Sequence, residues 1–364
     1  MAIGIYTDIL IYFAVIAPSA MKIITKEVRD VVSVLDAIIE EYKKERSEEK
    51  RDWRTYEQQV AHRIRTAIRE LDPLIEEAVS QVELVKGETR GRKPKLTLKQ
   101  KVTILLIKHL FGNSNREMAS MMFLFSLLSR IDVSYKTVER LYSDEEVFLA
   151  LLNLHALILE KKGVEHPDCT GDGTGYALTI KQHYASSAQK LKDKSNNKSE
   201  EMSAKGCRKI GKFIFSFRLM DLDTRMYIGY GTSLKSEKMA FEKALKMVSS
   251  LGIGMNSIRI DRYYSLQKYV KHLENLFGKN ITIYLIPKKN ATIKGPLKWK
   301  KVLYDFINYP KSYLAEYFRR NQSESAFSED KRRFGWKIPQ KRPERIETNN
   351  FCTSLWHNMF WLGV

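Results

Sequence analysis

The chain has few of the residues that build disulfide or zinc sites. It contains three cysteines, Cys169, Cys207 and Cys352, and no two of them have the close spacing of a metal-binding motif. The histidines form no such motif with each other or with a cysteine. We therefore expect neither a disulfide framework nor a zinc centre, and a reducing cytoplasmic compartment fits this composition.

Two other common features are missing. No stretch matches G-x-x-x-x-G-K-[ST], so we expect no nucleotide cofactor. The apolar residues 1–20 are interrupted by Pro18 and lack a basic N-terminal segment, which is atypical of a membrane span or a signal peptide. We interpret residues 1–20 as a dispensable extension of doubtful role, and we expect no membrane partner.

Positive charge, by contrast, is in clear excess. Lysine and arginine number 62 and aspartate and glutamate 43, for a formal net charge of +19. This excess favours a polyanionic partner, of which nucleic acid is the commonest. An acidic membrane surface fits less well, because the basic residues are spread over several segments. The composition, 43% hydrophobic and 29% charged, is that of a globular protein.

The first part of the chain is predicted to be helical. Apolar residues such as Val28, Val32 and Leu35 recur at helical spacing, and a second amphipathic stretch runs over 60–85. We expect an all-α N-terminal region over 21–89.

The next region, 90–160, carries two candidate DNA-contacting features. Its basic arm is predicted either to contact DNA phosphates or to form a solvated hinge; its candidate residues are Arg90, Arg92 and Lys93. A helix over 116–128, a turn, and a second helix that includes Lys136 resemble a helix-turn-helix, whose second helix reads the major groove. Short helical hairpins are common, so this pattern is weak by itself.

Strand patterns begin near Cys169. The predicted elements are strands over 168–179, 213–220 and 226–233, a helix over 237–251, a strand over 257–261, a helix over 266–276, a strand over 281–286, and helices over 301–306 and 312–334. Three strands, helix, strand, helix, strand, helix is the order of the ribonuclease H-like fold. We expect an α/β ribonuclease H-like catalytic core over 161–345, with a mixed five-stranded sheet and flanking helices. A basic insertion, 181–212, lies within it, and an apolar tail, 346–364, is expected to close the core or to contact a second copy.

Three acids lie at chemically suggestive places in this order. Asp172 lies in the first strand among glycines that would let a substrate backbone approach, Asp261 ends the fourth strand, and Glu324 lies on the last helix. Carboxylates so placed are able to share hard cations, and two such ions promote in-line phosphoryl displacement. Each acid also has a plain alternative as a turn or helix-cap residue. Asp168 competes with Asp172 as the first acid.

The last predicted helix carries a specific spacing. Steps of three, four and seven residues place Tyr317, Arg320, Glu324 and Lys331 within roughly 60° of one helical face. A face with one acid, two cations and a phenol is suited to binding a metal ion and a phosphate. The alternative is a solvated helix with charge pairs four residues apart.

This run, Tyr317-x2-Arg320-x3-Glu324-x6-Lys331, resembles the Tyr-Arg-Glu-Lys signature of a large group of bacterial and archaeal insertion-sequence transposases. Those proteins carry a DDE triad on a ribonuclease H-like core. The segments 172–175 and 261–265 are similar to the first and second acidic motifs of that group. The resemblance covers about residues 160–345.

The resemblance implies a function. Asp172, Asp261 and Glu324 would bind two Mg²⁺ ions, with Mn²⁺ as a substitute. The protein would bind the terminal inverted repeats of its element, cleave double-stranded DNA and join the 3′ ends to a target. We expect a homodimer or higher multimer on DNA, associated with the nucleoid in the cytoplasm.

Further residues would contact DNA. The resemblance implies that Tyr317, Arg320 and Lys331 hold phosphates at the transposon ends. Trp299 lies among lysines, so it is a candidate for stacking on an extruded base, with a packing role as the alternative.

Two alternative functions stay open. One is a ribonuclease H-like nuclease that performs no strand transfer. The other is a catalytically silent DNA-binding regulator that derives from a transposase.

Overall fold

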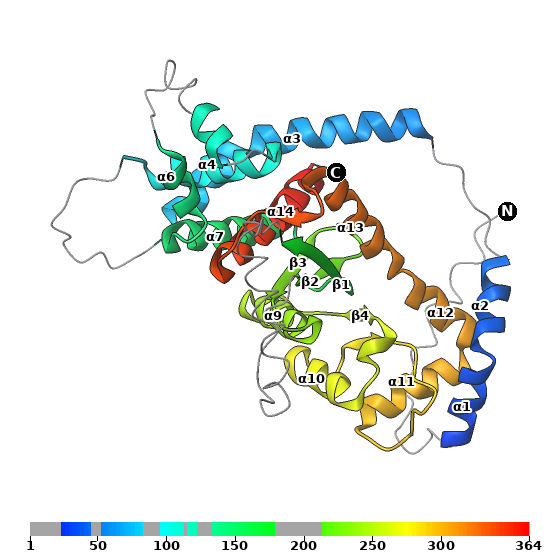
Figure 1. Cartoon of the computed structure of the whole chain (residues 1–364). Helices are drawn as coiled ribbons and strands as arrows, with labels where there is room; N and C mark the ends of the chain where they lie inside the picture. Colours follow the sequence, from blue (N-terminus) through cyan, green and yellow to red (C-terminus); the bar gives the residue numbers. More distant parts are fainter. Residues whose placement is uncertain are drawn as a thin grey trace, which may run out of the picture. The chain divides into compact units, whose positions relative to one another are not determined.

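The computed structural model describes residues 23–44, 52–82, 95–112, 115–121, 133–178 and 213–363 (Figure 1). The chain divides into two compact units. The smaller unit comprises Met1–Glu49 and Asn256–Arg320, and the larger unit comprises Lys50–Met255 and Asn321–Val364. The predicted helical region 21–89 therefore contributes to both.

The larger unit is built on an antiparallel sheet. Its strands are β1 (Asp168–Leu178), β2 (Phe213–Asp221) and β3 (Tyr227–Ser233), in the order β3-β2-β1, and the short β6 (Lys337–Ile338) runs parallel to β1. The turn after β2 is closed by the Asp221 carboxylate, which accepts hydrogen bonds from the amide and the hydroxyl of Thr224 at 2.9 and 2.6 Å. The three predicted strands are thus confirmed.

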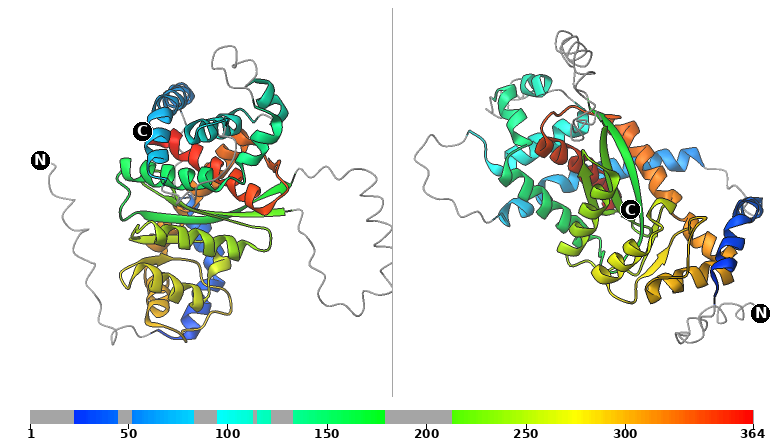
Figure 2. Two further views of the ribbon diagram at one scale, coloured as in Figure 1. Left: turned by 90° about the vertical axis from the view of Figure 1, so that its left-hand side faces the viewer. Right: turned by 60° about the horizontal axis from the view of Figure 1, so that its bottom comes forward.

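Helices cover both faces of this sheet. They are α3 (Trp53–Ser80), α4 (Leu98–Phe111), α6 (Tyr135–Leu141), α7 (Glu145–Lys161), α9 (Glu237–Ser250), α13 (Asn321–Phe334) and α14 (Pro343–Leu362). In the left view of Figure 2 the sheet lies edge-on, with α14 on one side and α9 on the other. Every residue of α14 from Thr348 to Phe360 is buried. The predicted role of the tail in closing the core is therefore confirmed.

The smaller unit contains a parallel strand pair. Its elements are α1 (Thr25–Ser33), α2 (Leu35–Lys44), β4 (Ser257–Ile260), the 3₁₀ turn η3 (Arg262–Tyr264), α10 (Gln267–Phe277), β5 (Thr282–Tyr284), α11 (Leu297–Asn308) and α12 (Pro310–Phe318). Strands β4 and β5 pair in parallel, connected by η3 and α10. All four residues of β4 are buried, as is usual for a strand in a parallel sheet.

The predicted single helix over 312–334 is wrong. The chain forms α12 and α13 instead, and the break falls at Arg319 and Arg320. There the backbone turns more tightly: the amides of Arg319 and Arg320 donate to the carbonyls of Glu316 and Tyr317, three residues back. Tyr317 and Glu324 therefore lie on different helices and in different units.

The α/β class is confirmed. The five predicted strands are present, three in the larger unit and two in the smaller, with parallel and antiparallel pairs and flanking helices. In the described stretches before Asp168, all regular structure is helical. Within the described residues, no helix combines the length and the apolar character needed to cross a bilayer.

Candidate active site

The first predicted acid, Asp172, lies in the middle of β1. It is half-buried and pairs in register with Arg218 of β2, so both side chains point to the same face of the sheet. Arg218 contacts α13 and α14 residues on that face, and α13 packs against β1. Asp172 Oδ1 accepts a hydrogen bond of 2.9 Å from the amide of Gly173. This acid therefore faces the helix that carries Glu324.

The glycines around Asp172 have a packing reason. Gly171, Gly173 and Gly175 point to the opposite face of β1, because side chains alternate along a strand. A Cβ atom at Gly173 would collide with Glu237, and one at Gly175 with Phe213. The predicted approach of a substrate backbone over these glycines is therefore wrong: protein side chains occupy that space.

Helix α13 presents two predicted residues. Glu324 is exposed in its first turn. Lys331 lies two turns later, with Nζ 5.3 Å from the ring centroid of Tyr176 and 4.7 Å from that of Trp336. Burial, and to a smaller degree the nearby Arg218 guanidinium, lowers the pKa of Lys331. Lys331 thus lies on the Asp172 face of β1, beside Tyr176.

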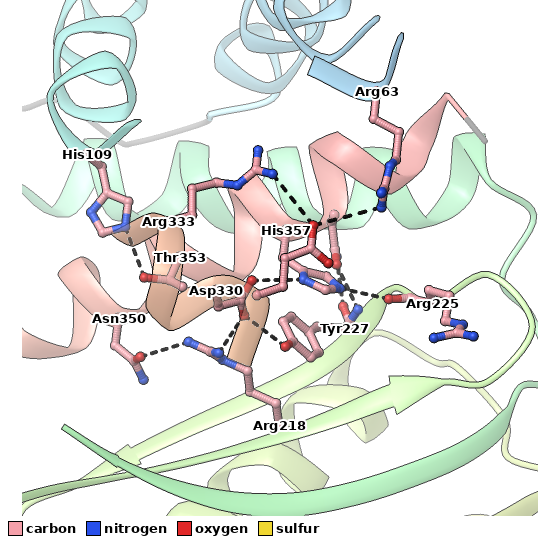
Figure 3. A network of polar contacts seen from close by, with 12 residues as sticks. Arg63, His109, Arg218, Arg225, Tyr227, Asp330, Arg333, Asn350, Thr353 and His357 are labelled. Atoms are coloured by element: carbon pink, nitrogen blue, oxygen red, sulfur yellow. Dashed lines mark hydrogen bonds and ion pairs between the residues drawn. The ribbon is translucent and has the colours of Figure 1, made fainter. Parts of the chain in front are cut away.

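A buried polar network fixes α13 to the sheet and to α14 (Figure 3). Asp330 of α13 accepts hydrogen bonds from Arg218 Nη1 and the Tyr227 hydroxyl, both at 2.8 Å. Its other oxygen lies 3.0 Å from His357 Nδ1, and His357 Nε2 lies 2.9 Å from the carbonyl oxygen of Arg225. Burial, reinforced by the Asp330 carboxylate, raises the pKa of Tyr227 well above its usual value, so the phenol remains a donor.

The sequence reasoning missed this network. Its members are far apart along the chain, and no sequence pattern assigns His357 a role. One signal was available: Arg218 interrupts an otherwise largely apolar strand, Phe-Ile-Phe-Ser-Phe-Arg-Leu-Met. A buried arginine requires an acidic or polar partner, because an unpaired buried charge is costly.

The second predicted acid, Asp261, belongs to the smaller unit. It follows β4 and caps η3, where Oδ1 accepts a hydrogen bond of 2.7 Å from the amide of Tyr263. Its Oδ2 lies 3.8 Å from Arg320 Nη2, and the Asp261 side chain keeps 40% of its surface exposed. Tyr317 is buried, with its ring 5.8 Å from the guanidinium carbon of Arg320. Arg320 thus lies between an acid and an aromatic ring, both named by the sequence reasoning.

The predicted triad draws on both units. Asp172 and Glu324 belong to the larger unit, and Asp261 belongs to the smaller. In the part of the chain that the structure describes, no group of three or more His, Cys, Asp or Glu side chains forms a ready-made cation site. Each acid lies on the expected kind of element, and their meeting stays a prediction.

The other predicted contacts fare differently. Arg90, Arg92 and Lys93 lie outside the described residues, as do residues 122–132, which include most of the turn of the predicted helix-turn-helix. Lys136 is exposed on α6, whose N-terminus is capped by the Ser134 hydroxyl.

Trp299 does not stack on DNA bases from where it lies. Its side chain is 2% exposed, and its indole nitrogen donates a hydrogen bond of 2.8 Å to the carbonyl of Thr292. Burial therefore argues against the stacking role and favours the packing alternative for this residue.

The fold and these residues together define an α/β protein with acids on a strand, at a strand end and on a helix, and with an arginine 3.8 Å from the acid at the strand end. No family model and no solved structure matches the chain. It is, however, 42% identical over 345 residues to the probable transposase for insertion sequence element ISA1214 of Archaeoglobus fulgidus, an alignment that covers 94% of this chain and 98% of that protein. The chain belongs to the family of this insertion-sequence transposase.

Proposed function

We propose that this transposase is a DDE-type DNA-cleaving and strand-transferring enzyme on a ribonuclease H-like core. The observation that carries the proposal is the similarity over nearly the whole length of the chain to a probable insertion-sequence transposase. The placement of Asp172 on a strand, Asp261 at a strand end and Glu324 on a helix supports it. It would act on double-stranded DNA at the ends of its element, as a homodimer or higher multimer in the cytoplasm.

The proposed metal ligands are Asp172, Asp261 and Glu324. Their oxygen-only donor set fits Mg²⁺, or Mn²⁺ as a substitute, because hard cations prefer carboxylate oxygens. Asp172 is half-buried and Glu324 exposed, so both are placed to be reached by solvent ions. When bound, a pair of such ions would activate the attacking hydroxyl and stabilise the leaving oxygen.

The chain's own cations would bind the DNA. Arg320 Nη2 lies 3.8 Å from Asp261 Oδ2, so its guanidinium would contact a phosphate beside this acid. Tyr317 packs against Arg320 and would hold it in position. Lys331 would contact phosphate from the Asp172 side, because its compact side-chain nitrogen suits a point contact.

The test is cleavage of DNA from the ends of the element by acid variants. Asp172→Asn, Asp261→Asn and Glu324→Gln should each abolish magnesium-dependent cleavage and leave DNA binding largely intact, since each removes a metal ligand and little volume. Asp168→Asn, at the rival first acid, is the matched control and should cut normally. A triad variant that cuts at nearly the wild-type rate would refute the assignment.

Strand transfer separates the proposal from its alternatives. Pre-cut element ends and a target duplex should yield joined products with the wild-type chain. Cutting without joining would identify a ribonuclease H-like nuclease. Binding without any magnesium-dependent nick would identify a silent DNA-binding regulator.

A further inference from the structure

A groove of about 1180 Å³ runs beside α13 in the larger unit. The first turns of α3, the turn between β2 and β3, and the C-terminal end of α14 form its other walls. It follows α13 from Asn321 to Arg333 and includes Glu324, the proposed metal ligand. Any strand bound along it would therefore pass the proposed site of cleavage.

The groove is lined with more cations than anions. Its charged lining residues are Arg63, Arg225, Arg332, Arg333, Glu324 and Glu329. The four arginines thus face two carboxylates, and one of these, Glu324, is assigned to the metal. The excess positive charge favours a ligand that carries several anionic groups.

Arg63 is the buried arginine of the groove lining. It is 6% exposed, and its Nη1 atom has no hydrogen-bond partner. That atom lies 3.9 Å from Glu329 Oε1, which also lies 3.6 Å from Arg333 Nη2, and Figure 3 shows the Arg63 and Arg333 side chains converging. A desolvated guanidinium nitrogen without a hydrogen-bond acceptor is costly, so an anionic oxygen that reached it would be bound strongly.

Arg225 is held toward the same groove by its backbone. Its φ of 64° is left-handed, the one positive φ at a non-glycine position among the described residues. Its carbonyl oxygen is bound to His357, so the Asp330 network stabilises this conformation. Its guanidinium carbon lies 5.7 Å from the ring of Trp361, against which Arg63 also packs at 4.5 Å. Two cations on one ring create a local site for negative charge.

We propose that this groove binds the phosphodiester backbone of one DNA strand, with Arg63, Arg225 and Arg332 contacting successive phosphates beside Glu324. Arginine suits this task because its planar fork matches phosphate oxygens. The inference rests on the proposed function, since it takes Glu324 to lie at the scissile phosphate.

The experiment measures DNA affinity of the full chain as a function of salt. The probe is a labelled duplex from the end of the element, without magnesium, and the variants are Arg63→Gln and Arg332→Gln. Each should weaken binding about fivefold and reduce the slope of log K against log salt by about one, because one phosphate contact is lost. Arg65→Gln, on α3 but outside the groove lining, is the control and should bind as wild type.

The outcomes are separable. Arg332 is exposed, so its variant keeps the fold and decides the matter even if Arg63→Gln unfolds. Wild-type affinity and slope in Arg332→Gln would overturn the inference. Magnesium-dependent cleavage by the wild-type chain is assayed in parallel. If the wild type cuts DNA and the groove variants bind DNA as the wild type does, only the proposal for the groove is refuted. If the groove variants bind more weakly but the wild type does not cut, only the proposed function is refuted.

Discussion

Two aspartate–arginine pairs, one in each unit, differ in the distance between their charged atoms, in exposure and in the hydrogen bonds around them. Asp330 and Arg218 lie 2.8 Å apart with side chains 3% and 0% exposed, and further hydrogen bonds surround them. Asp261 and Arg320 lie 3.8 Å apart with side chains 40% and 15% exposed. A buried ion pair held by further hydrogen bonds cannot exchange partners cheaply, whereas a longer and more accessible ion pair exchanges partners at a smaller cost. The first pair is suited to holding a helix, and the second to binding a ligand.

The largest expected effect on stability comes from breaking the buried pair. Asp330→Asn leaves the Arg218 charge buried without its carboxylate, and we expect a loss of about 3–5 kcal/mol in the free energy of unfolding. Asp261→Asn is the matched substitution at the exposed pair and should change stability by less than about 1 kcal/mol, since asparagine also caps helices well. Urea denaturation of both variants measures the difference. Equal losses would erase the contrast between the two pairs.

A second, smaller effect is a loss of folding stability at low pH, caused by two buried histidines. Burial lowers the pKa of His109 to about 3 and that of His155 to about 4, from an ordinary 6.5. At a pH between the lowered pKa of each histidine and 6.5, that histidine is protonated in the unfolded chain but not in the folded chain. Stability is therefore complete above pH 6.5 and is lost as the pH falls, by about 2 kcal/mol per histidine near about pH 4.5.

Both histidines belong to the larger unit, so hydrogen exchange followed by mass spectrometry should show its peptides opening as the pH falls. In His155→Gln the amide can keep the hydrogen bond to the Ile228 carbonyl without titrating. This variant should lose less stability on acidification than the wild type. The same acid sensitivity in both would show that His155 is not responsible.

The sequence predicted what local patterns encode. β-branched and aromatic runs located all five strands, and Asp172, Asp261 and Glu324 lie on the elements expected for them. The break between α12 and α13 at Arg319–Arg320 contains no glycine or proline, so no residue type there predicts the end of a helix. The glycines of β1 were interpreted through Asp172, although the constraint comes from side chains of β2 and α9 on the other face.

The contacts that position the site depend on distance in three dimensions. Arg218, Asp330 and His357 come from a strand and two helices separated by long stretches of chain, and periodicity does not pair such residues. The division into two units follows the same logic, since the smaller one combines the N-terminal helices with a segment that begins near residue 256. Patterns of hydrophobicity describe elements one at a time, and only packing decides which of them associate.

The smallest expected effect compares two tryptophans with opposite exposure. Trp299→Phe should lower the free energy of unfolding by about 1 kcal/mol, because the hydrogen bond to the Thr292 carbonyl is lost in a buried site. DNA affinity should not change. Trp336, 62% exposed, is the matched position, and Trp336→Phe should leave stability within about 0.5 kcal/mol of wild type. Weakened DNA binding by Trp299→Phe at unchanged stability would restore the stacking role that its burial argues against.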